Sequence, residues 1–327
     1  MLNTIFAFIN AAIIQGTPLL FGATGEIITE KSGNLKLGIP GIMYVGGISG
    51  IIGGYIYEHY TEDPNTALCI LIPLLSCMLG SLIMTLIYSF LTITLRANQN
   101  VTGLALTTFG IGIGNFFGGS LLKFFDESGS ISLMDCGAAF KMSLPFADDL
   151  GLFGKTFLSF GFLVYLAVII ALVASFILNK TRVGLNLRAV GENPATADSA
   201  GINVTKYKYV ATCIGSAIAG LGGIQYVMAY ANGSWSNDAF GDRGWMAIAL
   251  VIFALWKPYM AIIGAFVFGA LFNANTYAVG LGVETQELFK MLPYVVTIIV
   301  LVFTSMRKKR EHQPPAHLGL PYFREER

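Results

Sequence analysis

Few polar residues in this chain have the types and spacing that catalysis or cofactor binding requires. Gly154-Lys155-Thr156 has the ending of a phosphate-binding loop, but position 149, where that loop needs its first glycine, is an aspartate. Five acids lie between positions 126 and 149 without a partner motif, which favours a solvated face over a catalytic pair. The 4 cysteines and 3 histidines form no metal-ligand spacing. The sequence therefore predicts neither an enzyme nor a metal or cofactor site in this chain.

A second group of residues is polar but uncharged, and lies inside or at the start of long apolar stretches. Taken one at a time, such residues more often form hydrogen bonds between helices than contacts with a substrate. As a set, they could line a path for a neutral, polyhydroxylated solute. The candidates for this path are Asn100, Thr102, Thr107, Thr108, Asn115, Gln225, Asn273 and Asn275.

The elements that must position these residues are apolar helices. The chain has 327 residues, is 54% hydrophobic and is only 12% charged, against about 25% charged residues in a soluble domain. Nine stretches contain no Lys, Arg, Asp or Glu: 1–25, 37–57, 64–95, 97–122, 156–179, 209–237, 244–256, 258–283 and 291–306. Most are long enough to cross a bilayer, which needs about 20 apolar residues.

This pattern predicts an all-α polytopic membrane bundle with about seven to ten spanning helices. The stretch 244–256 is short, so it either crosses on its own or forms a re-entrant pair with 258–283. Segments starting at 100 and 242 open with polar residues and a glycine, which indicates either broken helices or ordinary helix starts. Because the charge-free stretches hold no ionisable group, we expect no proton relay or buried carboxylate ion site within the membrane.

The charges of the connections predict the orientation. The connections at 26–36, 96, 180–208 and 257, together with the tail, total +8, and those at 58–63, 123–155, 238–243 and 284–290 total −7. Positive connections stay in the cytoplasm, so the N-terminus is expected outside and the C-terminus inside. The resulting division is a transmembrane domain over 1–306, with an external acidic loop at 123–155, and a basic cytoplasmic tail at 307–327. The basic run at 307–310 is interpreted as an anchor after the last span and not as a lipid-surface or nucleic-acid patch.

Small residues recur at four-residue spacing in three of the apolar stretches, a pattern that lets helix backbones approach closely. The stripes are Gly46, Gly50 and Gly54; Gly110, Gly114 and Gly118; and Gly215, Ala219 and Gly223.

The cytoplasmic segment 179–208 contains start and stop signals for a short helix. Asn193 can cap a short helix that begins at Pro194 and ends at Gly201. This helix has too little apolar area to insert in lipid, so it suits docking into a groove on a cytoplasmic partner.

Two segments resemble a known family. Gly184-Leu-Asn-Leu-Arg-Ala-Val-Gly-Glu-Asn-Pro through Ala200-Gly201-Ile202-Asn203 resembles the coupling loop of ABC importer permeases for simple sugars and nucleosides, the ribose-type family. The stretch Glu30-Lys-Ser-Gly-Asn-Leu-Lys-Leu-Gly-Ile-Pro-Gly-Ile-Met is similar to the early signature of that family. It departs from the signature at Lys36, Pro40 and Ile42, where the family usually has Asn, Glu and Met.

The resemblance implies the permease subunit of an importer in the bacterial plasma membrane, nearest the nucleoside branch. Its implied partners are a second permease, a cytoplasmic ABC ATPase that holds ATP-Mg, an external binding lipoprotein or protein, and a nucleoside or simple-sugar substrate. The implied coupling residues are Gly184, Arg188, Gly191, Glu192, Asn193, Pro194, Ala200 and Gly201. The implied signature residues at the cytoplasmic start of the second span are Glu30, Gly33, Leu37, Gly38 and Gly41. The alternatives are a secondary transporter or channel for a small neutral solute and, less favoured, a membrane-embedded enzyme.

Overall fold

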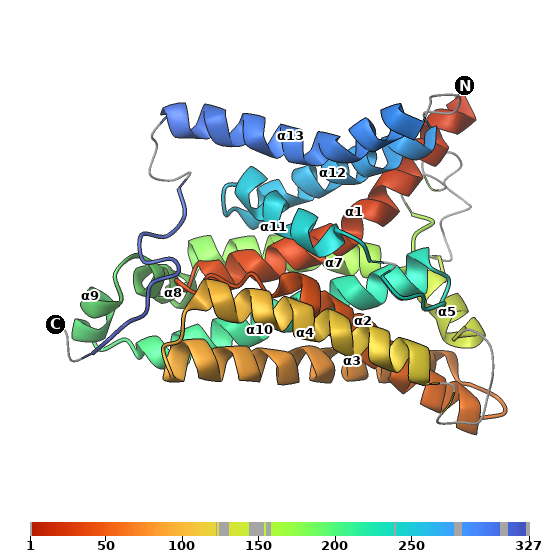
Figure 1. Cartoon of the computed structure of the whole chain (residues 1–327), viewed down its shortest axis with the longest axis horizontal. Helices are drawn as coiled ribbons and strands as arrows, with labels where there is room; N and C mark the ends of the chain where they lie inside the picture. Colours follow the sequence, from red (N-terminus) through yellow and green to blue (C-terminus); the bar gives the residue numbers. More distant parts are fainter. Residues whose placement is uncertain are drawn as a thin grey trace.

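The fold is a bundle of helices packed roughly along one direction (Figure 1). The computed structural model describes residues 2–121, 123, 131–143, 154, 158–238, 240–277, 283–307 and 313–324. The helices of this part are α1 (Leu2–Glu30), α2 (Ile39–Tyr60), α3 (Thr66–Ser89), α4 (Gln99–Ser120), α5 (Met134–Lys141), α7 (Phe162–Lys180), α8 (Arg182–Glu192), α9 (Pro194–Ser199), α10 (Val204–Gln225), α11 (Arg243–Phe253), α12 (Pro258–Tyr277) and α13 (Val283–Arg307). Short π-helical turns, η1 (Phe90–Thr94) and η4 (Tyr226–Tyr230), extend α3 and α10.

Helices of membrane-spanning length make up most of the bundle. Six described helices are long and apolar enough to cross a bilayer: α1, α2, α3 with η1, α4, α7 and α10 with η4. Three shorter apolar helical segments lie in α11, α12 and α13. The prediction of an all-α polytopic membrane bundle is therefore confirmed.

The two groups of connections separate to opposite ends of the bundle, as the charge pattern predicts. Helices α8 and α9 and the C-terminus lie at one end, and the N-terminus and α5 lie at the other (Figure 1). At the α9 end, the Arg96 guanidinium stacks 4.6 Å above the Phe323 ring of the tail. At the α5 end, the Cys136 backbone N–H donates to Glu58 Oε1 at 2.6 Å. We refer to these as the cytoplasmic and external ends.

Helices α1, α2 and α10 form the centre of the bundle, and the predicted small-residue stripes lie at their contacts. A Cβ placed on Gly110 of α4 would lie 2.6 Å from the Gly41 Cα of α2. A Cβ on Gly46 of α2 would lie 2.8 Å from the Gly220 Cα of α10. The backbones therefore approach as closely as glycine allows, and larger residues at these positions would separate the helices.

Helix α11 forms only part of a crossing. The described residues between η4 and α11, 231–238 and 240–242, are not helical, and Trp235 packs against the Tyr44 ring of α2 before α11 begins at Arg243. Leu255 and Trp256 then adopt positive φ angles of 54°, and α12 starts at Pro258. The short stretch thus belongs to a broken crossing that α11 completes, and it is not a re-entrant pair with α12. Helix α4, by contrast, has an ordinary start, because the Asn98 side chain caps it.

Candidate functional site

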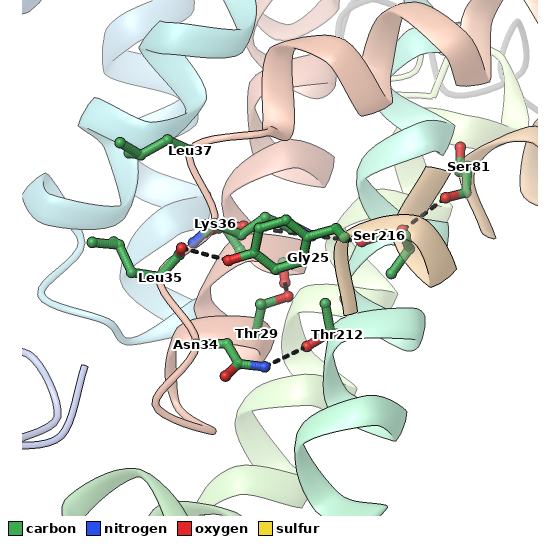
Figure 2. Close-up of polar contacts among 12 residues, drawn as sticks. Gly25, Thr29, Asn34, Leu35, Lys36, Leu37, Ser81, Thr212 and Ser216 are labelled. Atoms are coloured by element: carbon green, nitrogen blue, oxygen red, sulfur yellow. Dashed lines mark hydrogen bonds and ion pairs between the residues drawn. The ribbon is translucent and has the colours of Figure 1, made fainter. Parts of the chain in front are cut away.

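The connection between α1 and α2, residues 31–38, is largely buried in the bundle and is hydrogen-bonded by side chains of α1, α3, α4 and α10. Figure 2 shows Asn34 beside Thr212 and Lys36 beside Ser216. Asn34 Nδ2 donates to Thr212 Oγ1 of α10 at 3.0 Å. The Leu35 backbone N–H donates to Gln99 Oε1 at 2.7 Å, and its carbonyl accepts from the Tyr88 hydroxyl at 2.6 Å. Buried backbone groups cost free energy unless they are paired, so these polar side chains are what allows a loop to lie here.

Lys36 is the charged centre of this connection. Its ammonium donates to Ser216 Oγ of α10 at 2.5 Å and lies 3.7 Å from Glu26 Oε2 of α1. The Lys36 backbone N–H also donates to Glu26 Oε1, at 3.2 Å. Both side chains have 0% exposure. The pair therefore joins α1, the connection and α10 at the core of the bundle.

The expectation that no ionisable group lies within the spans is wrong. Helix α1 continues through Glu26 to Glu30, and both glutamates are buried, as is Arg243 at the start of α11. Each span predicted from the sequence ends at the first charged residue. The first span is therefore predicted to end at residue 25, although α1 continues to Glu30. A buried charge is tolerated when a counter-ion or hydrogen bond accompanies it.

The signature residues lie where α1 ends and α2 begins. The Trp256 indole N–H, beyond α11, donates to Glu30 Oε2. Gly33 has φ +86°, a left-handed conformation that favours glycine. The Leu37 carbonyl accepts from Thr107 Oγ1 at 2.8 Å, Gly38 is the residue before α2, and Gly41 lies against α4. The structure thus brings these residues into one packed region, and Glu30 belongs to the end of α1, not to the second span.

The predicted short helix exists as α9, and its cap and its first residue are as predicted. Asn193 Oδ1 accepts from the Thr196 backbone N–H at 3.0 Å, and Pro194 is the first residue of α9. Gly201 follows with φ +82°. Pro194 and Ala197 are buried, and Val190, Ala197 and Val204 form a small apolar cluster beneath the helix. The opposite face of α9, which carries Thr196 and Ser199, is exposed.

The segment before α9 was expected to be a loop, but residues Arg182–Glu192 form helix α8. Thr181 caps it by accepting from the Gly184 backbone N–H at 3.1 Å. Leu187 and Val190 face inward, and this spacing of buried apolar residues is the signal that could have revealed the helix. Gly184 and Gly191 hid that signal, because glycine disfavours helix interiors.

The predicted coupling residues divide into two groups. Gly184, Gly191 and Pro194 are buried and hold α8 and α9 in place, and Arg188 is half-buried. The exposed members are Glu192, Asn193, Ala200 and Gly201. This second group offers the most surface to another molecule.

The tail crosses this region instead of extending away from it. The His317 backbone N–H donates to the Gly191 carbonyl at 3.0 Å, and the Gly319 N–H donates to the Gly33 carbonyl at 3.2 Å. The Ala316 N–H donates to Glu192 Oε2 at 3.4 Å. Segments far apart in sequence, 31–33, 191–192 and 316–319, are thus joined through backbone hydrogen bonds. Residues 308–312, with most of the predicted basic run, lie outside the described part.

A cavity of about 540 Å³ lies beside α8 at the cytoplasmic end. Three of its lining residues are cations, Lys31, Arg188 and Lys257, and one is the acid Glu192. Burial lowers the pKa of Lys31, Glu192 opposes that shift, and Arg188 adds to it. The cavity also places Lys257 at the cytoplasmic end, as the charge pattern predicts.

The predicted path residues do not gather at one place. Asn100 is exposed and Thr102 half-buried at the start of α4, while Thr108 donates to the Leu104 carbonyl of its own helix. Asn115 Nδ2 donates to Asp238 Oδ1 at 3.0 Å, near the external end. Gln225 and Asn273 are buried in α10 and α12, and the side chain of Asn275 lies outside the described part. The role of these residues in a path stays a prediction.

Arg243 organises a second buried group. Its guanidinium lies 4.4 Å from the Tyr226 ring centroid and 4.6 Å from that of Phe272. It also donates to Gln15 Oε1 and to the Phe240 carbonyl, each at 3.1 Å. The cation thereby ties α1, α12 and η4 to the non-helical segment before α11. In the sequence, the signal for this group is Arg243 itself, a charged residue at the start of the apolar segment 242–253.

This architecture, a bundle of apolar helices with Glu26, Lys36 and Arg243 held by partners in its interior and a capped helix exposed at one end, defines a multi-pass membrane protein. The sequence profile of the family described as branched-chain amino acid transport system / permease component matches residues 8–301, and the chain belongs to that family.

Similar proteins named for transport support the same assignment. The chain is 31% identical to the nucleoside ABC transporter permease protein NupC of Lactococcus lactis subsp. cremoris, over 92% of this chain and 93% of the relative. It is 28% identical to the guanosine ABC transporter permease protein NupQ of Bacillus subtilis, over 98% and 97%. It is 29% identical to a putative glucose ABC transporter permease of Haloferax volcanii, over 91% and 92%.

The protein is therefore an integral membrane permease component of an ABC importer and not an enzyme. Such a component works with an ATPase and a substrate-binding protein.

Proposed function

We propose that this chain translocates nucleosides and receives the movement of its ATPase through α9. Of the three relatives named above, two are named for nucleosides or guanosine and one for glucose. A nucleoside is thus the first substrate to test, and a simple sugar is the second. On this proposal, an external binding protein delivers the solute, and ATP-Mg is held by the ATPase.

The observation that carries the coupling role is the placement of α9. Its exposed face consists of small or short polar residues at the cytoplasmic end, while its buried face packs on the cluster of Val190, Ala197 and Val204. A rigid, capped helix of this kind can enter a groove on a partner without disturbing its own support.

The route inward from α9 is also continuous. Helix α8 contacts the 31–33 turn through Gly191, where an added Cβ would meet the Lys31 carbonyl. That turn leads into the Lys36 connection, which contacts α10 and α1. A displacement of α9 would therefore be transmitted to the central helices. We further propose a second permease subunit, identical or similar, to complete the path.

The coupling proposal is tested by Thr196→Trp on the exposed face of α9, with Thr66→Trp as the matched control. Both threonines are exposed and lie in the first turn of a helix, but Thr66 begins α3 at the external end. Each variant is purified with its ATPase, and nucleoside uptake is measured in vesicles with ATP.

We expect Thr196→Trp to lose the ATPase on purification or to lose ATP-driven uptake, and Thr66→Trp to retain the ATPase. Full ATPase retention and full uptake by Thr196→Trp would overturn the role of α9. Inhibition of guanosine uptake by unlabelled nucleosides, but not by ribose or glucose, would support the nucleoside assignment. Inhibition by the sugars and not by the nucleosides would replace the nucleoside by a sugar. Uptake that follows an ion gradient without ATP would favour the secondary-transporter alternative.

A further inference from the structure

A second cavity, of about 720 Å³, lies at the cytoplasmic end, with Asp198 of α9 in its lining. Its walls come from three places far apart in sequence. They are the end of α3 with Arg96, the start of α10 with Lys206 and Lys208, and the tail with Tyr322 and Arg324. The volume falls within the range of small-molecule sites.

Lys208 is the residue that distinguishes this cavity from an ordinary surface hollow. It is only 4% exposed, yet it lines the cavity. Within the described part of the chain, its side chain has no ion-pair or hydrogen-bond partner. A cation on a largely buried side chain without a counter-ion is costly, so an anion in the cavity would offset part of that cost.

The other charges of the cavity point the same way. Arg96, Lys206 and Arg324 add three further cations, and Asp198 is the one acid among the lining residues. Asp198 is already engaged, since it accepts from the Tyr322 hydroxyl at 2.9 Å and pairs with Arg324 at 3.2 Å. The cavity therefore keeps an excess of positive charge after its own acid is counted.

The geometry points to a phosphate group as the anion. Arginine guanidinium groups present forked donors that fit phosphate oxygens, and the cavity has Arg96 and Arg324 in addition to the buried lysine. We propose that this cavity binds a phosphate-bearing anion, either the headgroup of an acidic phospholipid or a small phosphorylated solute. Its occupation would not depend on which solute is transported.

The surroundings favour the lipid as the source. Leu79, Ile83, Leu86 and Phe90 form an exposed apolar face along α3 and η1 that leads toward the cavity wall at Ile93 and Arg96. Acyl chains can lie along such a face while the headgroup enters the cavity. Because the walls include α10 and the tail, an occupant would tie the α9 region to α3.

The test measures thermal unfolding of the purified full-length protein in detergent while a ligand is titrated. The probes are phosphatidylglycerol, phosphatidylcholine as the zwitterionic comparison, and inorganic phosphate. A ligand that binds the folded state raises the melting temperature with its concentration. Lys208→Met keeps an apolar stem and removes the charge. Lys180→Met removes an exposed lysine at the cytoplasmic end of α7 and serves as the matched control.

We expect phosphatidylglycerol to stabilise the parent protein and Lys180→Met equally, and Lys208→Met to need roughly tenfold more lipid. A Lys208-dependent response to inorganic phosphate at similar concentration would assign the site to a free phosphorylated solute. If Lys208→Met does not fold, Arg96→Asn replaces it, because Arg96 has φ 59° and asparagine tolerates that conformation. The proposal is overturned if neither phosphatidylglycerol nor inorganic phosphate raises the melting temperature in a way that depends on Lys208 or Arg96.

Discussion

Lys36 and Ser216, which are 180 positions apart, are joined by a hydrogen bond of 2.5 Å in the core of the bundle. The same ammonium lies 3.7 Å from Glu26 Oε2. This arrangement explains why a lysine can stand where the family signature usually has an asparagine. The positive charge is balanced by the Glu26 carboxylate of α1, and the Ser216 hydroxyl of α10 accepts a hydrogen bond from the ammonium.

Removing the lysine alone should be strongly destabilising. Lys36→Met leaves the buried Glu26 without its counter-ion, and breaking one side of a buried pair typically costs about 3–5 kcal/mol. The double variant Glu26→Gln/Lys36→Met should recover most of that loss, because no uncompensated charge remains. Thermal unfolding of both variants in detergent provides the measurement. Equal melting temperatures for Lys36→Met and the parent protein would contradict the ion pair.

Loss of the α9 cap should act locally. Asn193→Ala removes the acceptor for the Thr196 N–H, and such a change costs about 1 kcal/mol of helix stability. We expect faster amide hydrogen exchange across α9, detected by mass spectrometry. Asn65→Ala is the matched control, because Asn65 caps α3 at the external end by accepting from the Ala67 N–H at 2.9 Å. Unchanged exchange in α9 of Asn193→Ala would show that the cluster beneath the helix, and not the cap, maintains it.

Two neighbouring glycines of α4 should respond differently to the same substitution. A Cβ at Gly110 would lie 2.6 Å from the Gly41 Cα, whereas a Cβ at Gly112 would meet nothing within 4 Å. Gly110→Ala should therefore lower the stability by about 1–3 kcal/mol through overpacking. Gly112→Ala should be neutral or stabilise by up to about 1 kcal/mol, because alanine favours the helix. A comparison of melting temperatures decides the matter, and equal losses in the two variants would contradict the close α2–α4 contact.

Arg243→Lys should impair transport without releasing the ATPase. Lysine keeps the charge but loses the forked donors and the planar contact with the rings of Tyr226 and Phe272. A desolvated cation–π contact contributes about 2 kcal/mol, so we expect at least a severalfold fall in uptake. Arg182→Lys, at an exposed arginine of α8, is the control and should transport normally. Normal uptake by Arg243→Lys would mean that charge alone holds the segment before α11.

Local features of the sequence were enough to determine the fold class, the separation of the connections to two ends of the bundle, and α9. Apolar stretches and the alternation of charge need no knowledge of distant contacts, and the cap of Asn193, the position of Pro194 and the turn at Gly201 are likewise local. The small-residue stripes also predicted close helix contacts, although not which helices would meet.

Only the tertiary structure decided what happens to the charges. Glu26, Lys36 and Arg243 look like membrane boundaries in the sequence, yet each is buried. The physical reason is that the free energy of a buried charge depends on its partner, and the partners here come from α10, η4 and α12. The path of the tail over Gly33 and Gly191, and the cavity beside Lys208, depend in the same way on segments that meet only after folding.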